Sequence, residues 1–85
     1  MGFHAMAYMF EIYYCAPADP AKEARLTDLV ARLGGRFDFR EEPTASNNGG
    51  VCLTYEFDKW ETAATAADDL RQRGEHVEGP QDYGP

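Results

Sequence analysis

The chain has 85 residues, of which 44% are hydrophobic and 27% are charged, and its formal net charge at pH 7 is −7. A chain of this length forms one domain, and this composition is typical of a globular protein. The acidic balance argues against direct binding to nucleic acid or to an anionic membrane surface, because few basic side chains are present to neutralise phosphates. It permits a basic protein as a partner.

The sequence predicts neither a membrane-spanning segment nor an N-terminal signal peptide. No stretch approaches the roughly 20 apolar residues that span a bilayer, and the first ten residues lack the basic start and apolar run of a signal peptide. We therefore expect a soluble cytoplasmic protein. We interpret residues 1–6 as a disordered leader or an expression remnant, residues 7–80 as one α+β domain, and residues 81–85 as a C-terminal tail.

Residues that bind metals or cofactors are scarce. The two cysteines, Cys15 and Cys52, form neither a disulfide framework nor a four-ligand zinc site, and the two histidines, His4 and His76, lie far from them in the sequence. No glycine-rich phosphate-binding motif is present either. The sequence predicts no metal site and no cofactor.

The spacing of hydrophobic residues predicts the first two elements, a strand followed by a helix. Residues 8–15 alternate, with aromatic and β-branched side chains on one face, which indicates a strand. Asp19 then offers a helix cap and Pro20 suits a first helical position. An apolar stripe with helical spacing follows and ends at two glycines. Its members are Leu26, Leu29, Val30 and Leu33.

The middle of the chain alternates again in two segments. In residues 36–42, Phe37 and Phe39 are expected to face the core. Residues 43–50 contain proline, asparagine and glycine, which is typical of a turn-forming loop. Residues 51–57 form the clearest strand. Its expected core side chains are Val51, Leu53, Tyr55 and Phe57.

The last two elements are a helix and a weak strand. Asp58, followed three residues later by Glu61, predicts a helix cap, and Gly74 predicts the end of that helix. The expected buried stripe consists of Trp60, Ala63, Ala64, Ala67 and Leu70. Residues 75–79 follow as a strand that Pro80 ends, which favours the edge of a sheet because proline lacks a backbone donor.

The element order β-α-β-β-α-β predicts a ferredoxin-like sandwich. Right-handed crossovers place the first and third strands in the centre, so the predicted antiparallel sheet order is 4-1-3-2. Both helices then cover one face of the sheet, and the other face stays open. The expected open face carries Met9, Glu11, Tyr13, Cys15, Arg36, Asp38, Arg40, Cys52, Thr54 and Glu56.

The open face is interpreted as a binding surface. It does not suit RNA, because the third strand presents cysteine, threonine and glutamate outward in place of stacking aromatic residues. It suits a partner protein or a second copy of the chain. Cys15 and Cys52 would be neighbours only if residue 12 pairs with residue 55, and a shift of two residues would separate them.

We therefore expect a small acidic protein-binding module. A sharper version is a stoichiometric inhibitor or adaptor that offers carboxylates to a basic, nucleic-acid-handling protein. Anti-CRISPR proteins are similar in size and charge, although no motif supports that likeness. The acidic residues available are Glu41, Glu42, Asp58, Glu61, Asp68, Asp69, Glu75 and Glu78.

Two other functions stay open. A homodimeric small-ligand regulatory domain of the ACT-like kind has the same strand order, but residues 16–20 lack the glycine that such a site favours. A small dimeric α+β barrel enzyme would use His76, Tyr13 and Glu11. We expect no enzyme, because no complete set of nucleophile, base and orienting acid is present.

Overall fold

The computed structural model describes residues 7–43 and 49–82, which form six elements in the order β-α-β-β-α-β. The elements are β1 (Tyr8–Cys15), α1 (Pro20–Arg32), β2 (Gly35–Glu41), β3 (Gly50–Phe57), α2 (Trp60–Gln72) and β4 (His76–Asp82). The predicted leader 1–6, most of the predicted loop and the last three residues of the predicted tail lie outside the described residues.

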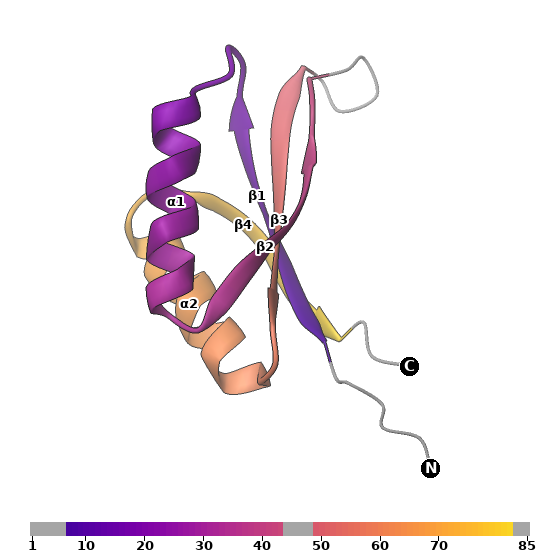
Figure 1. Cartoon of the computed structure of the whole chain (residues 1–85), viewed down its shortest axis with the longest axis vertical. Coiled ribbons are helices and arrows are strands. Elements are labelled where there is room, and N and C mark those ends of the chain that lie inside the picture. The colour runs from indigo at the N-terminus through magenta and orange to yellow at the C-terminus, as the bar shows by residue number, and fades with distance from the viewer. Residues whose placement is uncertain (1–6, 44–48, 83–85) are drawn as a thin grey trace.

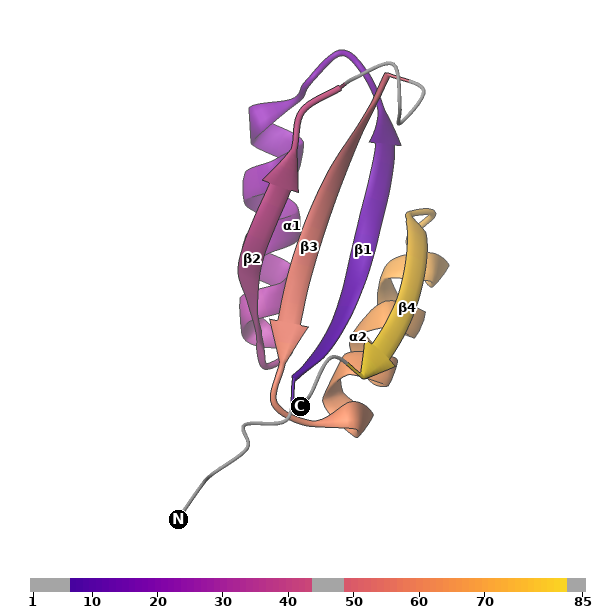
Figure 2. The same cartoon turned by 90° about the vertical axis from the view of Figure 1, so that its right-hand side faces the viewer.

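The four strands form one antiparallel sheet in the order β2-β3-β1-β4, which is the predicted order read from the other edge. Both helices lie on the same face of this sheet (Figure 1). Seen from the open face, α1 lies behind β2 and β3, and α2 lies behind β4 (Figure 2). The ferredoxin-like α+β prediction is therefore confirmed.

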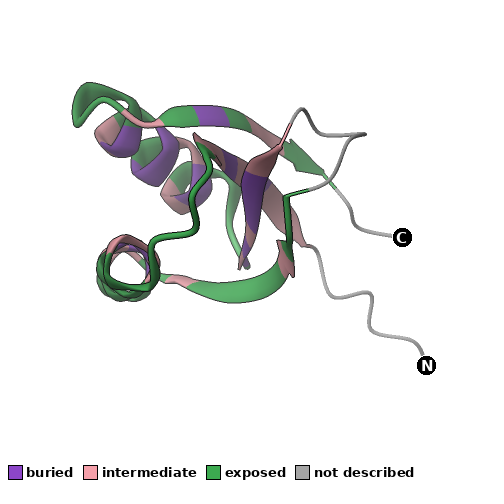
Figure 3. Ribbon diagram, turned by 90° about the horizontal axis from the view of Figure 1, so that it is seen from above, coloured by how far each residue is buried: buried purple, intermediate pink, exposed green. Residues whose placement is uncertain are grey.

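The core lies between the two central strands and the helices. Figure 3 shows buried residues concentrated on the centre of the sheet and on α2, whereas β2 is mostly exposed. Neither of the two helices in the described ranges, each of 13 residues, is long and apolar enough to cross a membrane. The largest fully buried side chains are Tyr55, Phe10, Phe57, Ile12, Leu53, Leu70, Val30 and Val51.

The first helix begins and packs as its sequence predicts. The side chain of Asp19 accepts a hydrogen bond from the Lys22 backbone N–H at 3.1 Å, and proline occupies the first helical turn. This cap satisfies one of the backbone donors that a helix start leaves unpaired. Leu26 and Val30 are buried, while Leu29 and Leu33 pack against the rim of the core.

The second helix differs from the prediction at its start. It begins at Trp60, with Lys59 at the cap position and no side-chain cap bond, so the predicted Asp58 cap is wrong. Asp58 instead accepts a hydrogen bond from Arg36 at 3.0 Å. Trp60, predicted to be buried, is 46% exposed, and its ring meets that of Tyr8 edge-on. The buried stripe of α2 is Ala63, Ala66, Ala67 and Leu70.

A β-bulge in β2 overturns the predicted alternation of this strand. The register places Phe37 opposite Tyr55 but Phe39 opposite Thr54, so one extra residue lies between them. Such an insertion moves every later side chain to the other face of the sheet. Phe39 therefore belongs to the open face, and Arg40, predicted there, belongs to the helix face.

Neither phenylalanine of β2 is a core residue, which corrects the prediction for both. Phe37 is 46% exposed and Phe39 is 57% exposed. The ring of Phe37 covers one side of Tyr55, with 6.0 Å between the ring centroids. Because β2 is an edge strand, nothing among the described residues covers its outer side.

The last strand passes through its proline, whereas we expected it to end there. A register shift opposite Met9 and Glu11 accommodates Gly79 and Pro80, and β4 continues to Asp82. Gly79 has a φ of +111°, and a Cβ atom at this position would lie 3.0 Å from the backbone oxygen of Met9. The predicted edge position of β4 is confirmed. Two residues assigned to the tail thus belong to the sheet.

Candidate functional site

The strand register determines which side chains share the open face. Residues paired across neighbouring strands point to the same side of a sheet. The predicted members Met9, Glu11, Tyr13, Arg36, Thr54 and Glu56 are brought together, while Arg40 is not, and Asp38 lies exposed at the bulge. The register adds Phe39, Glu41, His76, Glu78 and Gln81 to the open face.

Negative charge dominates this face. Glu11, Glu41, Glu56 and Glu78 lie on it, against a single guanidinium, that of Arg36. Strands β1, β3 and β4 contain no lysine or arginine at all. Glu11 lies directly opposite Glu78, a like-charge pair that is unfavourable unless a cation approaches. The open face is therefore an acidic surface.

Tyr13 lies at the centre of a polar cluster on the open face. Its hydroxyl donates a hydrogen bond to Glu11 Oε1 at 3.3 Å, and its ring meets that of His76 at 5.8 Å between centroids. His76 Nε2 lies 3.3 Å from Glu78 Oε2. The sequence offered no partner for His76, because the partners come from another strand and from two positions further along β4.

The phenol of Tyr13 and the neighbouring thiol of Cys52 keep their protons. Burial raises the pKa of Tyr13 well above its usual value, and hydrogen bonding to Cys52 and the charge of Glu11 raise it further. Burial also raises the pKa of the Cys52 thiol, and the charges of Glu11 and Glu41 add to this effect. Both groups are thus neutral at pH 7. The cluster can donate hydrogen bonds, but it contains no activated thiolate or phenolate nucleophile.

The two cysteines do not pair. Cys52 lies opposite Tyr13, and Cys15 lies opposite Gly50, which is the two-residue shift that separates them. Both thiols are free, with Cys15 exposed and Cys52 buried. A redox pair on this face is therefore absent from the structure.

A second region with functional potential is a groove between α1 and β2. It has a volume of about 570 Å³ and a mostly apolar lining. Volumes of this size are common for sites that bind small molecules or peptide side chains. Its lining residues are Glu23, Ala24, Thr27, Asp28, Ala31, Phe37, Arg40 and Leu53.

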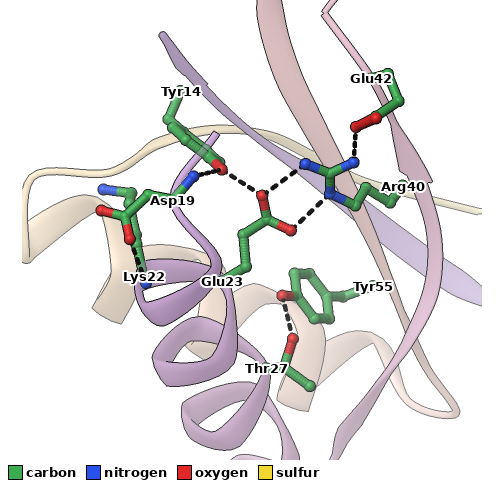
Figure 4. Close-up of polar contacts among 8 residues, drawn as sticks. All are labelled: Tyr14, Asp19, Lys22, Glu23, Thr27, Arg40, Glu42 and Tyr55. Carbon is green, nitrogen blue, oxygen red and sulfur yellow. Dashed lines mark hydrogen bonds and ion pairs between the residues drawn. The ribbon is translucent and has the colours of Figure 1, made fainter. Parts of the chain in front are cut away.

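Two of the lining residues, Glu23 and Arg40, belong to an ionic network between α1 and β2 (Figure 4). Glu23 on α1 accepts two hydrogen bonds from Arg40 on β2, at 2.7 Å from Nε and 3.0 Å from Nη2. The hydroxyl of Tyr14 also donates to Glu23, and Glu42 accepts from Arg40. The hydrogen bonds from Arg40 lower the pKa of Glu23, although burial opposes this shift. The bulge in β2 made this network possible by turning Arg40 toward α1.

The predicted acidic residues do not form one patch. On α2, Asp68 pairs with Arg71 at 3.2 Å and Asp69 pairs with Arg73 at 3.3 Å. Glu75 pairs with Lys22 at 3.1 Å. Glu42 and Asp58 contact the two arginines of β2, Glu61 lies in the first turn of α2, and only Glu41 and Glu78 join the open face.

Comparison with known proteins assigns no family. No family model matches the chain, and no curated protein matches it at a significant level. Within residues 7–43 and 49–82, no three side chains of the metal-binding types lie close enough together to hold a metal ion. The fold and the two surfaces described above are therefore the basis for a functional proposal.

Proposed function

We propose that this chain is a protein-binding module of the cytoplasm, without catalytic activity, whose open sheet face docks on a basic surface of another protein. The observation that carries this proposal is the charge on that face: four glutamates against one arginine, on a sheet in which three strands lack basic residues. A cationic partner would relieve the repulsion between Glu11 and Glu78 and would be steered toward the face from a distance.

The neutral side chains of the open face support the same kind of partner. Met9 and Tyr13 are half-buried between the carboxylates, and Phe39 is exposed beside them. Lysine and arginine place aliphatic stems on apolar surface while their charged ends reach carboxylates, and arginine also stacks on aromatic rings. Proteins that handle nucleic acid present such arrays of basic side chains, so a stoichiometric inhibitor or adaptor for one of them is the form of the proposal we favour.

A dimeric enzyme is a second candidate, because Tyr13, His76 and Glu11 lie together as that alternative required. Its weakness is electrostatic. Pairing two copies face to face would bring four glutamates of one copy onto four of the other, which opposes association. A sedimentation measurement that finds a stable dimer sensitive to changes at Tyr13 would favour this second candidate over the first.

The test compares two variants that each remove two negative charges. Immobilised wild-type chain, the Glu11→Gln/Glu78→Gln variant and the Asp68→Asn/Asp69→Asn variant are exposed to a lysate of the source organism or its host. We expect one stoichiometric basic protein to be retained by the wild type and by the α2 variant and to be released at high salt. The open-face variant should bind it at least about tenfold more weakly. Equal retention by both variants, or an acidic partner, would contradict the proposal.

A further inference from the structure

The two edges of the sheet are unequal. At the β4 edge, Gly79 and Pro80 interrupt the strand, and proline offers no backbone donor to an incoming chain. At the β2 edge, residues 35–41 contain no proline, and Phe37 and Phe39 are 46% and 57% exposed. An uncovered edge strand with exposed aromatic rings is a template for pairing with another strand.

The groove beside β2 would receive side chains of such a strand. Leu53 and Phe37 contribute from the sheet, and Ala24, Thr27 and Ala31 contribute from α1. Alternate side chains of a strand point to opposite faces of the sheet. A strand added outside β2 would therefore direct every second side chain toward the groove under α1 and the others toward the open face beside Phe39.

The charges around β2 indicate what this strand carries. Arg36 is paired with both Glu56 and Asp58, and Arg40 is paired with both Glu23 and Glu42. Each guanidinium is thus outnumbered by carboxylates. Asp38 makes no ion pair with any other described residue. A second copy of this chain would add the same negative excess, whereas a strand with lysine or arginine would complement it.

We propose that the basic partner adds an extended segment as a fifth strand to the outer edge of β2, alongside the groove between α1 and β2. Its apolar side chains occupy the groove against Phe37 and Leu53, and its basic side chains lie between them, near Asp38 and the carboxylates that surround the two arginines. Backbone hydrogen bonds to β2 supply affinity, and the groove selects the side chains. This inference rests on the proposed function, of which it names the recognised segment.

The experiment selects peptides from a random library of 12-residue segments displayed on phage, with the full chain as the target. We expect the selected peptides to alternate apolar residues with lysine or arginine and to lack proline at their centre. Bound peptide should slow hydrogen exchange at the backbone amides of β2, because strand addition alone pairs the outer amides of that strand. Replacing the central residue of a selected peptide with proline should weaken its binding at least tenfold.

Matched variants of the chain locate the binding site. Ala31→Leu fills the groove at an exposed position, and we expect it to weaken peptide binding at least tenfold. Trp60→Ser removes a ring as exposed as that of Phe37 that does not line the groove, and it should leave binding unchanged. Circular dichroism shows whether each variant is folded.

The outcomes separate the two proposals. One outcome would overturn the strand inference and leave the acidic docking face intact. In that outcome the selected peptides are basic and bind weakly to the Glu11→Gln/Glu78→Gln variant, but neither Ala31→Leu nor a central proline weakens their binding. Selection of acidic peptides, or of none, would overturn both. Basic peptides that protect β2 and bind weakly to the Ala31→Leu variant would support the strand inference, and weaker retention of the whole basic partner by the Glu11→Gln/Glu78→Gln variant would support the acidic docking face.

Discussion

The two helices cover the same sheet but pack against it very differently. On α2, the four side chains Ala63, Ala66, Ala67 and Leu70 have no exposed surface. On α1, the apolar side chains of Leu26 and Val30 are buried and that of Leu29 is half-buried, and a groove lies between the helix and β2. The two edge strands also differ. Strand β4 contains a bulge and a proline, which disfavour pairing with another strand, whereas β2 exposes the aromatic rings of Phe37 and Phe39.

Side-chain size explains much of this difference. Three alanines allow α2 to approach the sheet closely, which excludes water and fills the space with backbone and methyl groups. The apolar stripe of α1 consists of larger residues, whereas the apolar side chains that α1 contributes to the groove are small, those of Ala24 and Ala31. The α2 side therefore contributes most of the close packing between helix and sheet, and the α1 side leaves a groove beside β2.

The largest expected effect tests this division directly. Leu70→Ala should reduce the free energy of unfolding by about 2–4 kcal/mol, because it removes a fully buried side chain and leaves a cavity. Leu29→Ala, on the rim of α1, should cost about 1 kcal/mol. Urea denaturation followed by circular dichroism measures both, and equal losses would contradict the division.

Enlarging an alanine on each helix sharpens the same contrast. Ala67→Leu should destabilise the chain by about 1–3 kcal/mol, since nothing between α2 and the sheet can yield without strain. Ala31→Leu should change stability by no more than about 0.5 kcal/mol, because its side chain points into the open groove. A comparable loss for the two leucine variants would show that the groove is not open in solution.

Acid should weaken the α1 side through the Glu23 carboxylate. Its folded-state pKa is lowered by Arg40, so this group stabilises the folded chain above the ordinary glutamate pKa of about 4.3. The contribution disappears as the pH falls below that value toward the lower folded-state pKa. Glu23→Gln should lower the thermal midpoint by a few degrees at pH 7 and by less at pH 3. A difference from wild type that does not shrink with acid would contradict this role.

The smallest effect is expected at the surface of α2. Asp68→Asn/Asp69→Asn removes two exposed ion pairs at helical spacing, and such pairs contribute about 0.5 kcal/mol or less each. The thermal midpoint should move by no more than about 2 °C, which makes this variant a suitable control for the binding experiment. A larger fall would indicate that these aspartates have contacts beyond Arg71 and Arg73.

The sequence predicted the elements and their order because period-2 and period-3.6 patterns are local properties. It failed where one inserted residue changed the outcome: the bulge in β2 exchanged the faces of Phe39 and Arg40, and the bulge at Gly79 let β4 continue through Pro80. The acidity of the open face was only partly visible in the sequence. Glu11 and Glu56 were expected there, but the strand registers were needed to add Glu41 and Glu78 and to remove Arg40. The groove and the Glu23–Arg40 network were not, because they depend on the bulge in β2 and on how far α1 stands from the sheet.

The different surroundings of the two thiols have a practical consequence. Cys52 is 3% exposed and its pKa is raised, whereas Cys15 is exposed at the end of β1. A thiol-reactive fluorophore or spin label added to the native chain should therefore attach at Cys15 alone. The wild-type sequence thus offers a single labelling site on β1, which β3 separates from β2, and the approach of a partner can be followed there without engineering a cysteine.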